Sequence, residues 1–103
     1  MKQFESNILP FITDNTLVFS TSRKSKCSIE MDRFLREFRL IAAITTDYNS
    51  NQAYYFESNL DTNITMRIQL MNRTISCILA PNSYFEKHLT DIFLQQQDSL
   101  SLE

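Results

Sequence analysis

The chain has 103 residues, of which 43% are hydrophobic, 12% aromatic and 21% charged, and its formal net charge is −2. This length fits one ordinary domain, and the apolar fraction is too high for an intrinsically disordered chain. Glycine is absent, which excludes P-loops, dinucleotide fingerprints, EF-hand loops and nucleophile elbows, because each needs a residue without Cβ at a fixed position. We therefore expect a single non-enzymatic domain over residues 1–103, with no cofactor and no metal.

Short extended segments are expected at the start of the chain. Residues 8–12 are apolar but contain Pro10, which suits an edge strand or an entry segment. Asp14 and Asn15 are typical turn residues, and the β-prone residues 16–20 follow them. Residues 23–26 are basic, and we expect a solvated loop there rather than a contact with an acidic partner. Nucleic-acid binding is disfavoured because the net charge is negative and no basic stripe is present.

A first helix is predicted over residues 28–39. Met31, Phe34, Leu35 and Phe38 recur at intervals of three and four residues, which is the spacing of one helix face. Acidic residues occupy the first turn and arginines the last, as the helix dipole favours. Ser28 is the predicted N-cap.

The middle of the chain is predicted to be β-structure. Strands are expected over residues 41–47 and 52–57, with a turn at 48–51 between them and a loop at 59–63 after them. The clearest pattern follows: Ile64, Met66, Ile68 and Leu70 alternate with polar residues, as in a strand with one solvated face. A turn at 72–73 leads to a return strand at 74–79, whose predicted apolar face carries Ile75, Cys77 and Leu79.

A second helix is predicted over residues 83–97, after Pro81 ends the last strand. Ser83 and Glu86 form a capping-box pattern, and Tyr84, Phe85, His88 and Leu89 follow at helical spacing. The polar tail from about residue 97 is expected to fray. The sequence therefore predicts an α+β fold with a mainly antiparallel four- to five-stranded sheet and two packed helices. Such a sheet leaves two edges on which a partner chain could add strands.

Few side chains are candidates for chemistry. His88 is expected on the apolar side of its helix as a packed residue rather than a ligand or a catalytic group. Cys27 and Cys77 either form a disulfide that closes a loop of about 50 residues or are two unrelated buried thiols, and their spacing alone leaves both readings open. Tyr54, Tyr55 and Phe56 are expected to pack in the core, with a ligand pocket or a subunit contact as the alternative.

Taken in order, these features resemble the periplasmic domain of ToxR-family regulators, which are single-pass inner-membrane transcription activators. Cys27 lies beside the amphipathic segment 31–38, and a turn at 49–52 precedes an aromatic strand that ends at Ser58. The run 63–68 is close to the corresponding strand of the family, and Cys77 follows about nine residues later. The similarity covers residues 27–77, about half of the chain. The loop glycines of the family are missing, and residues 82–103 extend beyond the second cysteine.

The resemblance implies a function. Cys27 and Cys77 would be the disulfide pair of the family. The domain would lie in the periplasm as part of an inner-membrane protein and pair with a small membrane-anchored periplasmic partner of the ToxS or VtrC kind. In one member of the family the two chains together form a barrel that holds a bile salt, and the complex activates type III secretion genes. Tyr54, Phe56, Met66 and Ile68 are the candidates for lining such a site, with core packing as the rival role for each.

A rival interpretation remains open from the residues. A small cytosolic binding protein, such as a type III secretion chaperone or a toxin-immunity protein, would also be a small acidic α+β module, and its cysteines would be reduced. A hydrolase that uses His88 with a cysteine is a weaker alternative, because no partner residue has the required spacing.

Overall fold

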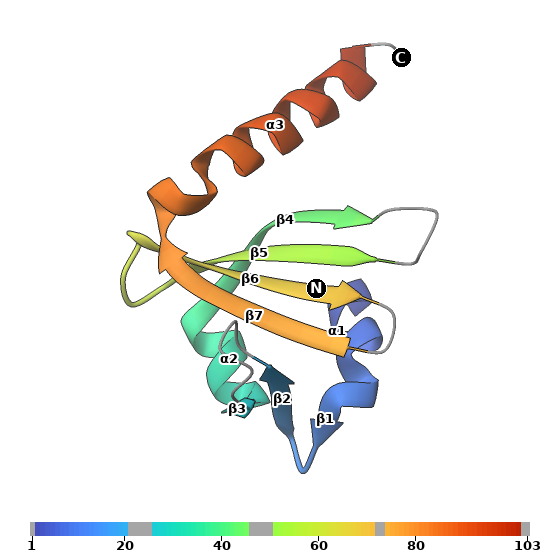
Figure 1. The fold of residues 1–103 in the computed structure, drawn as a ribbon, viewed down its shortest axis with the longest axis vertical. Coiled ribbons are helices and arrows are strands. Elements are labelled where there is room, and N and C mark those ends of the chain that lie inside the picture. Colours follow the sequence, from blue (N-terminus) through green and yellow to red (C-terminus); the bar gives the residue numbers. More distant parts are fainter. Residues whose placement is uncertain (1, 21–25, 46–50, 72–73, 102–103) are drawn as a thin grey trace.

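A computed structural model of the chain describes residues 2–20, 26–45, 51–71 and 74–101. In chain order, its elements are α1 (Lys2–Ile8), a 3₁₀ helix η1 (Leu9–Phe11), β1 (Ile12–Thr13), β2 (Thr16–Ser20), β3 (Lys26–Glu30), α2 (Met31–Glu37), β4 (Phe38–Thr45), β5 (Gln52–Ser58), β6 (Ile64–Met71), β7 (Thr74–Pro81) and α3 (Asn82–Ser101) (Figure 1). The predicted α+β class is therefore confirmed.

The sheet is larger than predicted. In the described residues it has seven strands rather than four or five, in the order β1-β2-β7-β6-β5-β4, with β3 paired to β2. The strands from β4 to β7 form an antiparallel meander, as expected. The sheet is mixed, however, because β2 meets β7 in parallel at the pair Ser20 and Ser76.

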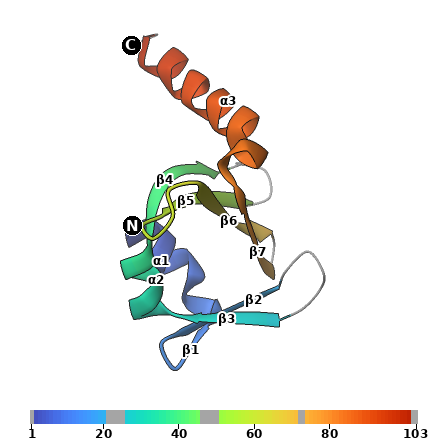
Figure 2. The same cartoon turned by 90° about the vertical axis from the view of Figure 1, so that its left-hand side faces the viewer.

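The sheet is strongly curled, and this curl separates two cores. In Figure 2 the β2–β3 pair faces the β4–β7 meander across the inside of the curl, and α1 and α2 close one side. The inner core contains Phe4 and Ile8 of α1, Phe34 of α2 and the inward residues of β5 to β7. The outer core is smaller and lies under the first half of α3, where Phe85 and Ile92 pack against Tyr55 and Ala42.

A β-bulge in β4 allows this strand to contribute side chains to both cores. Leu40 pairs with Phe56, but Ala42 pairs with Tyr55, so Ile41 is an additional residue in the ladder. Because the additional residue shifts the alternation of side chains, the residues after the bulge face the opposite side of the sheet from the one expected without it. Phe38 and Leu40 accordingly pack in the inner core, whereas Ala42 and Ile44 belong to the outer one.

The first residues form a helix that the sequence analysis did not predict. The expected extended segment at 8–12 is instead the end of α1, the 3₁₀ helix and the start of β1. Phe4 stacks against Phe34 and meets Tyr54 and Phe56 edge-on, so α1 supplies the centre of the inner core. The turn at Asp14 and Asn15 and the strand at 16–20 are confirmed.

The first predicted helix was too long. Residues 28–30 belong to β3, because they pair with 16–18 of β2, and residues 38–39 begin β4. Ser28 is therefore not an N-cap, and α2 begins at Met31, whose amide donates to the carbonyl of Asn15 at 2.8 Å. At the other end, the backbone and side-chain amides of Asn59 donate to the Glu37 and Arg36 carbonyls at 2.7 and 2.9 Å. Tertiary hydrogen bonds thus set both ends of this short helix.

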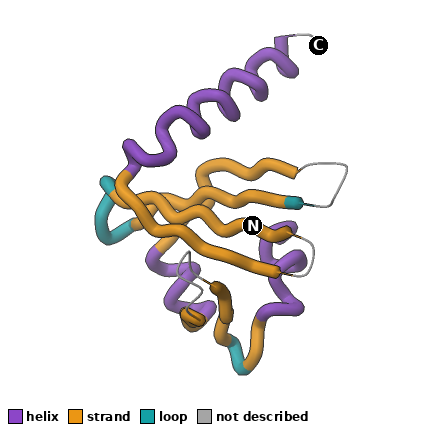
Figure 3. The backbone as a smooth tube through the Cα atoms, in the orientation of Figure 1, coloured by secondary structure: helices purple, strands orange, loops and turns teal. Residues whose placement is uncertain are grey.

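The last helix begins one residue earlier than predicted and continues to Ser101. Asn82 secures its start, since its amides donate to the carbonyls of Asn63 and Thr62 and its side-chain oxygen accepts from the Thr65 hydroxyl at 2.6 Å. His88 was predicted on the apolar side of the helix, but it is exposed, and the buried positions are Phe85 and Ile92. From its first turns α3 leaves the sheet at an angle, as Figure 3 shows. The turn predicted at 72–73 lies outside the described residues, and so does the turn predicted at 48–51 except for its last residue.

Candidate functional site

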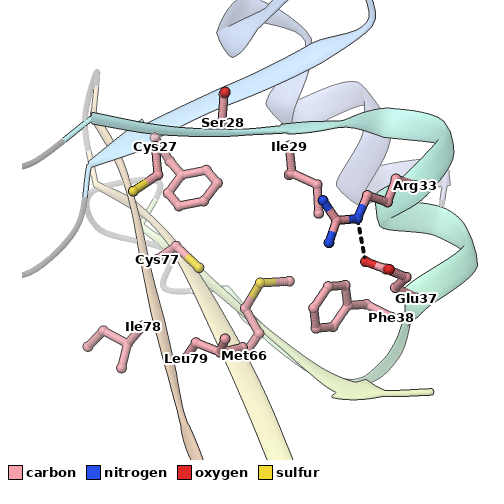
Figure 4. Close-up of a pocket in the computed structure, with 11 residues that line it drawn as sticks. Cys27, Ser28, Ile29, Arg33, Glu37, Phe38, Met66, Cys77, Ile78 and Leu79 are labelled. Carbon is pink, nitrogen blue, oxygen red and sulfur yellow. Dashed lines mark hydrogen bonds and ion pairs between the residues drawn. The ribbon is translucent and has the colours of Figure 1, made fainter. Parts of the chain in front are cut away.

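A cavity of about 570 Å³ opens on the inside of the curl, between β3 with α2 on one side and β6 with β7 on the other (Figure 4). Its volume falls within the range of about 300–1,000 Å³ that is usual for small-molecule sites. Ile29 of β3 and Phe38 at the start of β4 contribute apolar surface from one wall, while Met66 and Leu79 contribute it from the other. Phe19 of β2, which pairs with Cys27 of β3, also lines the cavity.

The strand registers explain why these side chains converge. Met66 pairs with Leu79 and Ile68 with Cys77, so the alternation of β6 and β7 directs all four toward the inside of the curl. On the opposite wall, Phe19 pairs with Cys27. Within the described residues, β2 pairs with β7 at Ser20 and Ser76, and the cavity lies between β3 and β7.

Two thiols lie on opposite walls of this cavity. Cys27 is half-buried on β3, Cys77 is buried on β7, and both are free thiols in this structure. Figure 4 shows both cysteines at the lining of this cavity. Burial raises the pKa of the Cys77 thiol from 9.0 to about 12, and the charge of the nearby Cys27 adds to this shift. The structure thus brings together the two cysteines that the sequence analysis singled out, and their disulfide stays a prediction.

One ion pair borders the cavity. The Nε of Arg33 donates to the Glu37 carboxylate at 2.9 Å, one turn further along α2. Arg33 is largely exposed, while Glu37 is mostly buried against the helix end. The mouth therefore carries a cationic and an anionic group, and the deeper surface is apolar with sulfur atoms. A ligand with an apolar body and a polar end suits such a lining.

Unpaired strand edges border the same cavity. Beyond Cys77, β7 pairs with β6 on one side, and no strand of the described residues lies on its other side. β3 likewise pairs only with β2 within the described part of the chain. Unpaired edge amides favour the addition of another strand. Leu79, which is 60% exposed at this edge, was predicted on an apolar face and has no cover in the described chain.

Of the four predicted lining residues, the structure places one at the cavity. Met66 lines it directly. Tyr54, Phe56 and Ile68 lie deeper, where they are buried in the inner core against α1 and α2. The Tyr54 hydroxyl is held by Asn7 and Gln52 in a set of hydrogen bonds of 2.9 Å each. Core packing, the rival role named for these residues, is the role these three have in this structure.

Most of the cavity lining was not predicted from the sequence. The lining residues that were not predicted as part of a site are Phe19, Ser28, Ile29, Arg33, Glu37, Phe38, Ile78 and Leu79. The alternation of β7 placed Leu79 on the face of Cys77, and this signal was present in the sequence. The contribution of β3 could not be found in the same way, because residues 28–30 were assigned to a helix.

The outer face has a second hollow of about 420 Å³ under the start of α3, near Thr65 and Asn82. Beside it, the Arg67 guanidinium lies over the Phe85 ring at 5.5 Å, which is the distance of a cation–π contact. In the described residues there is no group of three or more His, Cys, Asp or Glu side chains that could hold a metal ion. None of the helices in the described residues has both the length and the apolar character needed to cross a bilayer.

The chain was compared with protein-family models, curated proteins and solved structures, and nothing in any of the three comparisons matches it.

Proposed function

We propose that this chain is a periplasmic sensing domain of a membrane-anchored virulence transcription activator of the ToxR kind, related to the Vibrio regulator VtrA. It is a binding module and not an enzyme. It pairs with a small membrane-anchored periplasmic protein of the ToxS or VtrC type, and the pair binds a bile salt. Occupancy of the pair shifts the population of an assembled state and thereby signals to type III secretion genes.

One observation carries this proposal: an apolar cavity of about 570 Å³ opens between two strand edges that are unpaired within the described part of the chain. A steroid body is almost wholly apolar, so the hydrophobic effect supplies most of its affinity for such a surface. A partner strand on β7 would satisfy the free edge amides and cover Leu79. The cavity would then be enclosed by two chains rather than by one.

The ligand half of the proposal is tested by titrating the chain with taurodeoxycholate, below its micelle concentration, in heteronuclear NMR. We expect shift changes at the cavity residues. The variant Leu79→Gln should weaken binding by about tenfold or more, because losing the apolar contact of one leucine costs about 1.5 kcal/mol or more. The matched control is Leu60→Gln, which removes an even more exposed leucine that does not line the cavity. Equal affinity of the two variants, or no binding by the wild type, would contradict a bile-salt site here.

The partner half is tested separately, by co-expression with the product of the adjacent gene. A short neighbouring gene that encodes one membrane span and a periplasmic segment should yield a complex that co-purifies with this chain. Lys substitution of Leu79 should disrupt that complex, because it places a charge at the edge that the partner covers. A neighbouring toxin or effector gene whose product binds the chain would instead support the rival, a cytosolic immunity protein or secretion chaperone.

A further inference from the structure

We propose that the reduced chain binds one Cu(I) ion through the sulfur atoms of Cys27, Cys77 and Met66. This assignment is independent of the proposed sensing function. It concerns the thiol form of the two cysteines, which is the form that the structure contains.

The three sulfur-bearing side chains belong to one cavity. All three residues, which are labelled in Figure 4, line the same cavity from β3, β7 and β6. Met66 lies opposite Leu79 and Cys77 opposite Ile68, so Met66 and Cys77 are diagonal neighbours on one face of an antiparallel pair. Side chains at such positions are within reach of each other when one of them is long. Cys27 is near enough for its charge to raise the pKa of Cys77.

The chemistry of the donors also supports this assignment. Thiolate and thioether sulfurs are soft ligands and select Cu(I), whereas Mg²⁺, Ca²⁺ and Mn²⁺ prefer oxygen. The carboxylate nearest the cavity, that of Glu37, is held by Arg33 at 2.9 Å. The cavity therefore offers three soft donors in an apolar lining of Phe19, Ile29 and Phe38. Cu(I) accepts low coordination numbers, and a lining that carries few water molecules protects it from oxidation.

Binding changes no oxidation state. The two thiol protons leave to solvent, two copper–thiolate bonds form, and the thioether of Met66 donates a lone pair without losing a proton. Metal affinity at such a site rises with pH, because ligand protons are released. A Cys27–Cys77 disulfide would remove both thiolates, so oxidation of the pair and binding of Cu(I) exclude each other.

The experiment is an anaerobic titration of the reduced 103-residue chain with Cu(I), in competition with the chromogenic chelator bicinchoninate. We expect one equivalent of Cu(I) to be withdrawn from the chelator, with thiolate-to-copper charge-transfer absorption in the ultraviolet. Cys27→Ser should abolish this withdrawal. Met66→Leu, which keeps the volume of the side chain, should weaken binding on the order of tenfold.

Met71→Leu is the matched control, because Met71 lies on the same strand but is exposed and does not line the cavity. It should bind Cu(I) as the wild type does. Wild-type protein that withdraws no more Cu(I) than Cys27→Ser would overturn the proposal. So would equal affinities of Met66→Leu and Met71→Leu, or an X-ray absorption spectrum that fits two sulfur neighbours rather than three. Circular dichroism of each variant separates loss of copper from loss of fold.

Discussion

At the scale of single residues, the chain has no glycine, so asparagine and aspartate adopt the positive φ angles that a tight turn requires. Asp14 and Asn15 have φ angles of 52° and 57°, in the left-handed region, at the turn between β1 and β2. Their short polar side chains make this region less costly than it is for other residues with a Cβ. The same turn accepts the Met31 amide through the Asn15 carbonyl, so it also fixes the start of α2.

A substitution pair at Asn15 tests this reading. Asn15→Ala should lower the free energy of unfolding by about 1 kcal/mol, because alanine disfavours positive φ. Asn15→Gly should leave it unchanged or raise it, since glycine reaches the same angles without a steric penalty. Both are measured by urea denaturation of the reduced protein. If the two variants are equally destabilised, the backbone angle at this position is not the cause.

The pH dependence of stability should carry a signature of Cys77. Its pKa is about 12 in the folded chain against 9.0 for a free thiol, because it is buried. Below pH 9 both states hold the proton, and the effect on stability is constant. Between about pH 9 and 12 the unfolded chain loses the proton first, so the free energy of unfolding should fall by about 1.4 kcal/mol per pH unit.

The measurement compares the reduced wild type with Cys77→Ala by chemical denaturation at several pH values, since tyrosines and lysines titrate in both proteins. The alanine variant should be less stable at neutral pH, and its free energy of unfolding should decline less steeply above pH 9. Parallel curves for the two proteins would show that the thiol does not titrate in this way.

Residue-scale prediction from the sequence succeeded where a strand alternates cleanly. The pattern in 64–70 and 75–79 correctly predicted that Met66, Ile68 and Cys77 share a buried face, which lies on the inside of the curl. It failed where burial depends on elements distant in sequence. Thr65 was expected on a solvated face but is only 2% exposed, because Asn82 at the start of α3 packs over it.

At the scale of elements, strand pairing rather than local helix propensity determined the structure of residues 28–30. Residues 28–30 were included in the predicted helix because Ser28 is a residue type that suits an N-cap. They pair instead with β2, and no feature of the local sequence reports such a long-range partner. The sequence of α1 carries a weak helical signal, because Phe4 and Ile8 are spaced by one helical turn. Contact of Phe4 with Phe34 and Phe56 is what stabilises this helix. Short helices of this kind are stabilised by tertiary packing rather than by propensity.

Attachment of α3 to the sheet should depend on one side chain. Phe85 is completely buried and meets the Tyr55 ring edge-on, with 5.8 Å between ring centroids. Phe85→Ala should cost about 3–5 kcal/mol in the free energy of unfolding, as expected for truncation of a buried aromatic residue. Leu94→Ala, on the exposed face of the same helix, should change it by no more than about 0.5 kcal/mol. Similar losses in both variants would mean that α3 is not anchored through Phe85.

At the scale of the whole molecule, the two cysteines connect parts of the fold that share little backbone pairing. A bridge between Cys27 and Cys77 would join β3 to β7 across the cavity and close a loop of about 50 residues. The loop-closure model then gives a stabilisation of at most roughly 4 kcal/mol. The oxidised chain, prepared without reductant, should therefore unfold at a higher urea concentration than the reduced chain. The Cys27→Ser variant should show no such difference.

Mass spectrometry of the intact chain supplies the control, because a disulfide lowers the mass by two hydrogen atoms. If the mass is the same with and without reductant, the disulfide prediction is wrong. Whole-molecule features were the least accessible from the sequence: the predicted meander is present, but the curl and the cavity arise from the meeting of β2 and β7.

The parallel contact between Ser20 and Ser76 also bears on the order in which the parts of the fold should form. The meander from β4 to β7 joins neighbours in sequence and needs only short loops, which close quickly. β2 also pairs with its sequence neighbours β1 and β3, but within the described residues it joins the meander at β7, the last strand of the meander. Ser20 and Ser76 are about 55 positions apart in the sequence, so β2 and its neighbours should join β7 after the local strand pairs of the meander have formed.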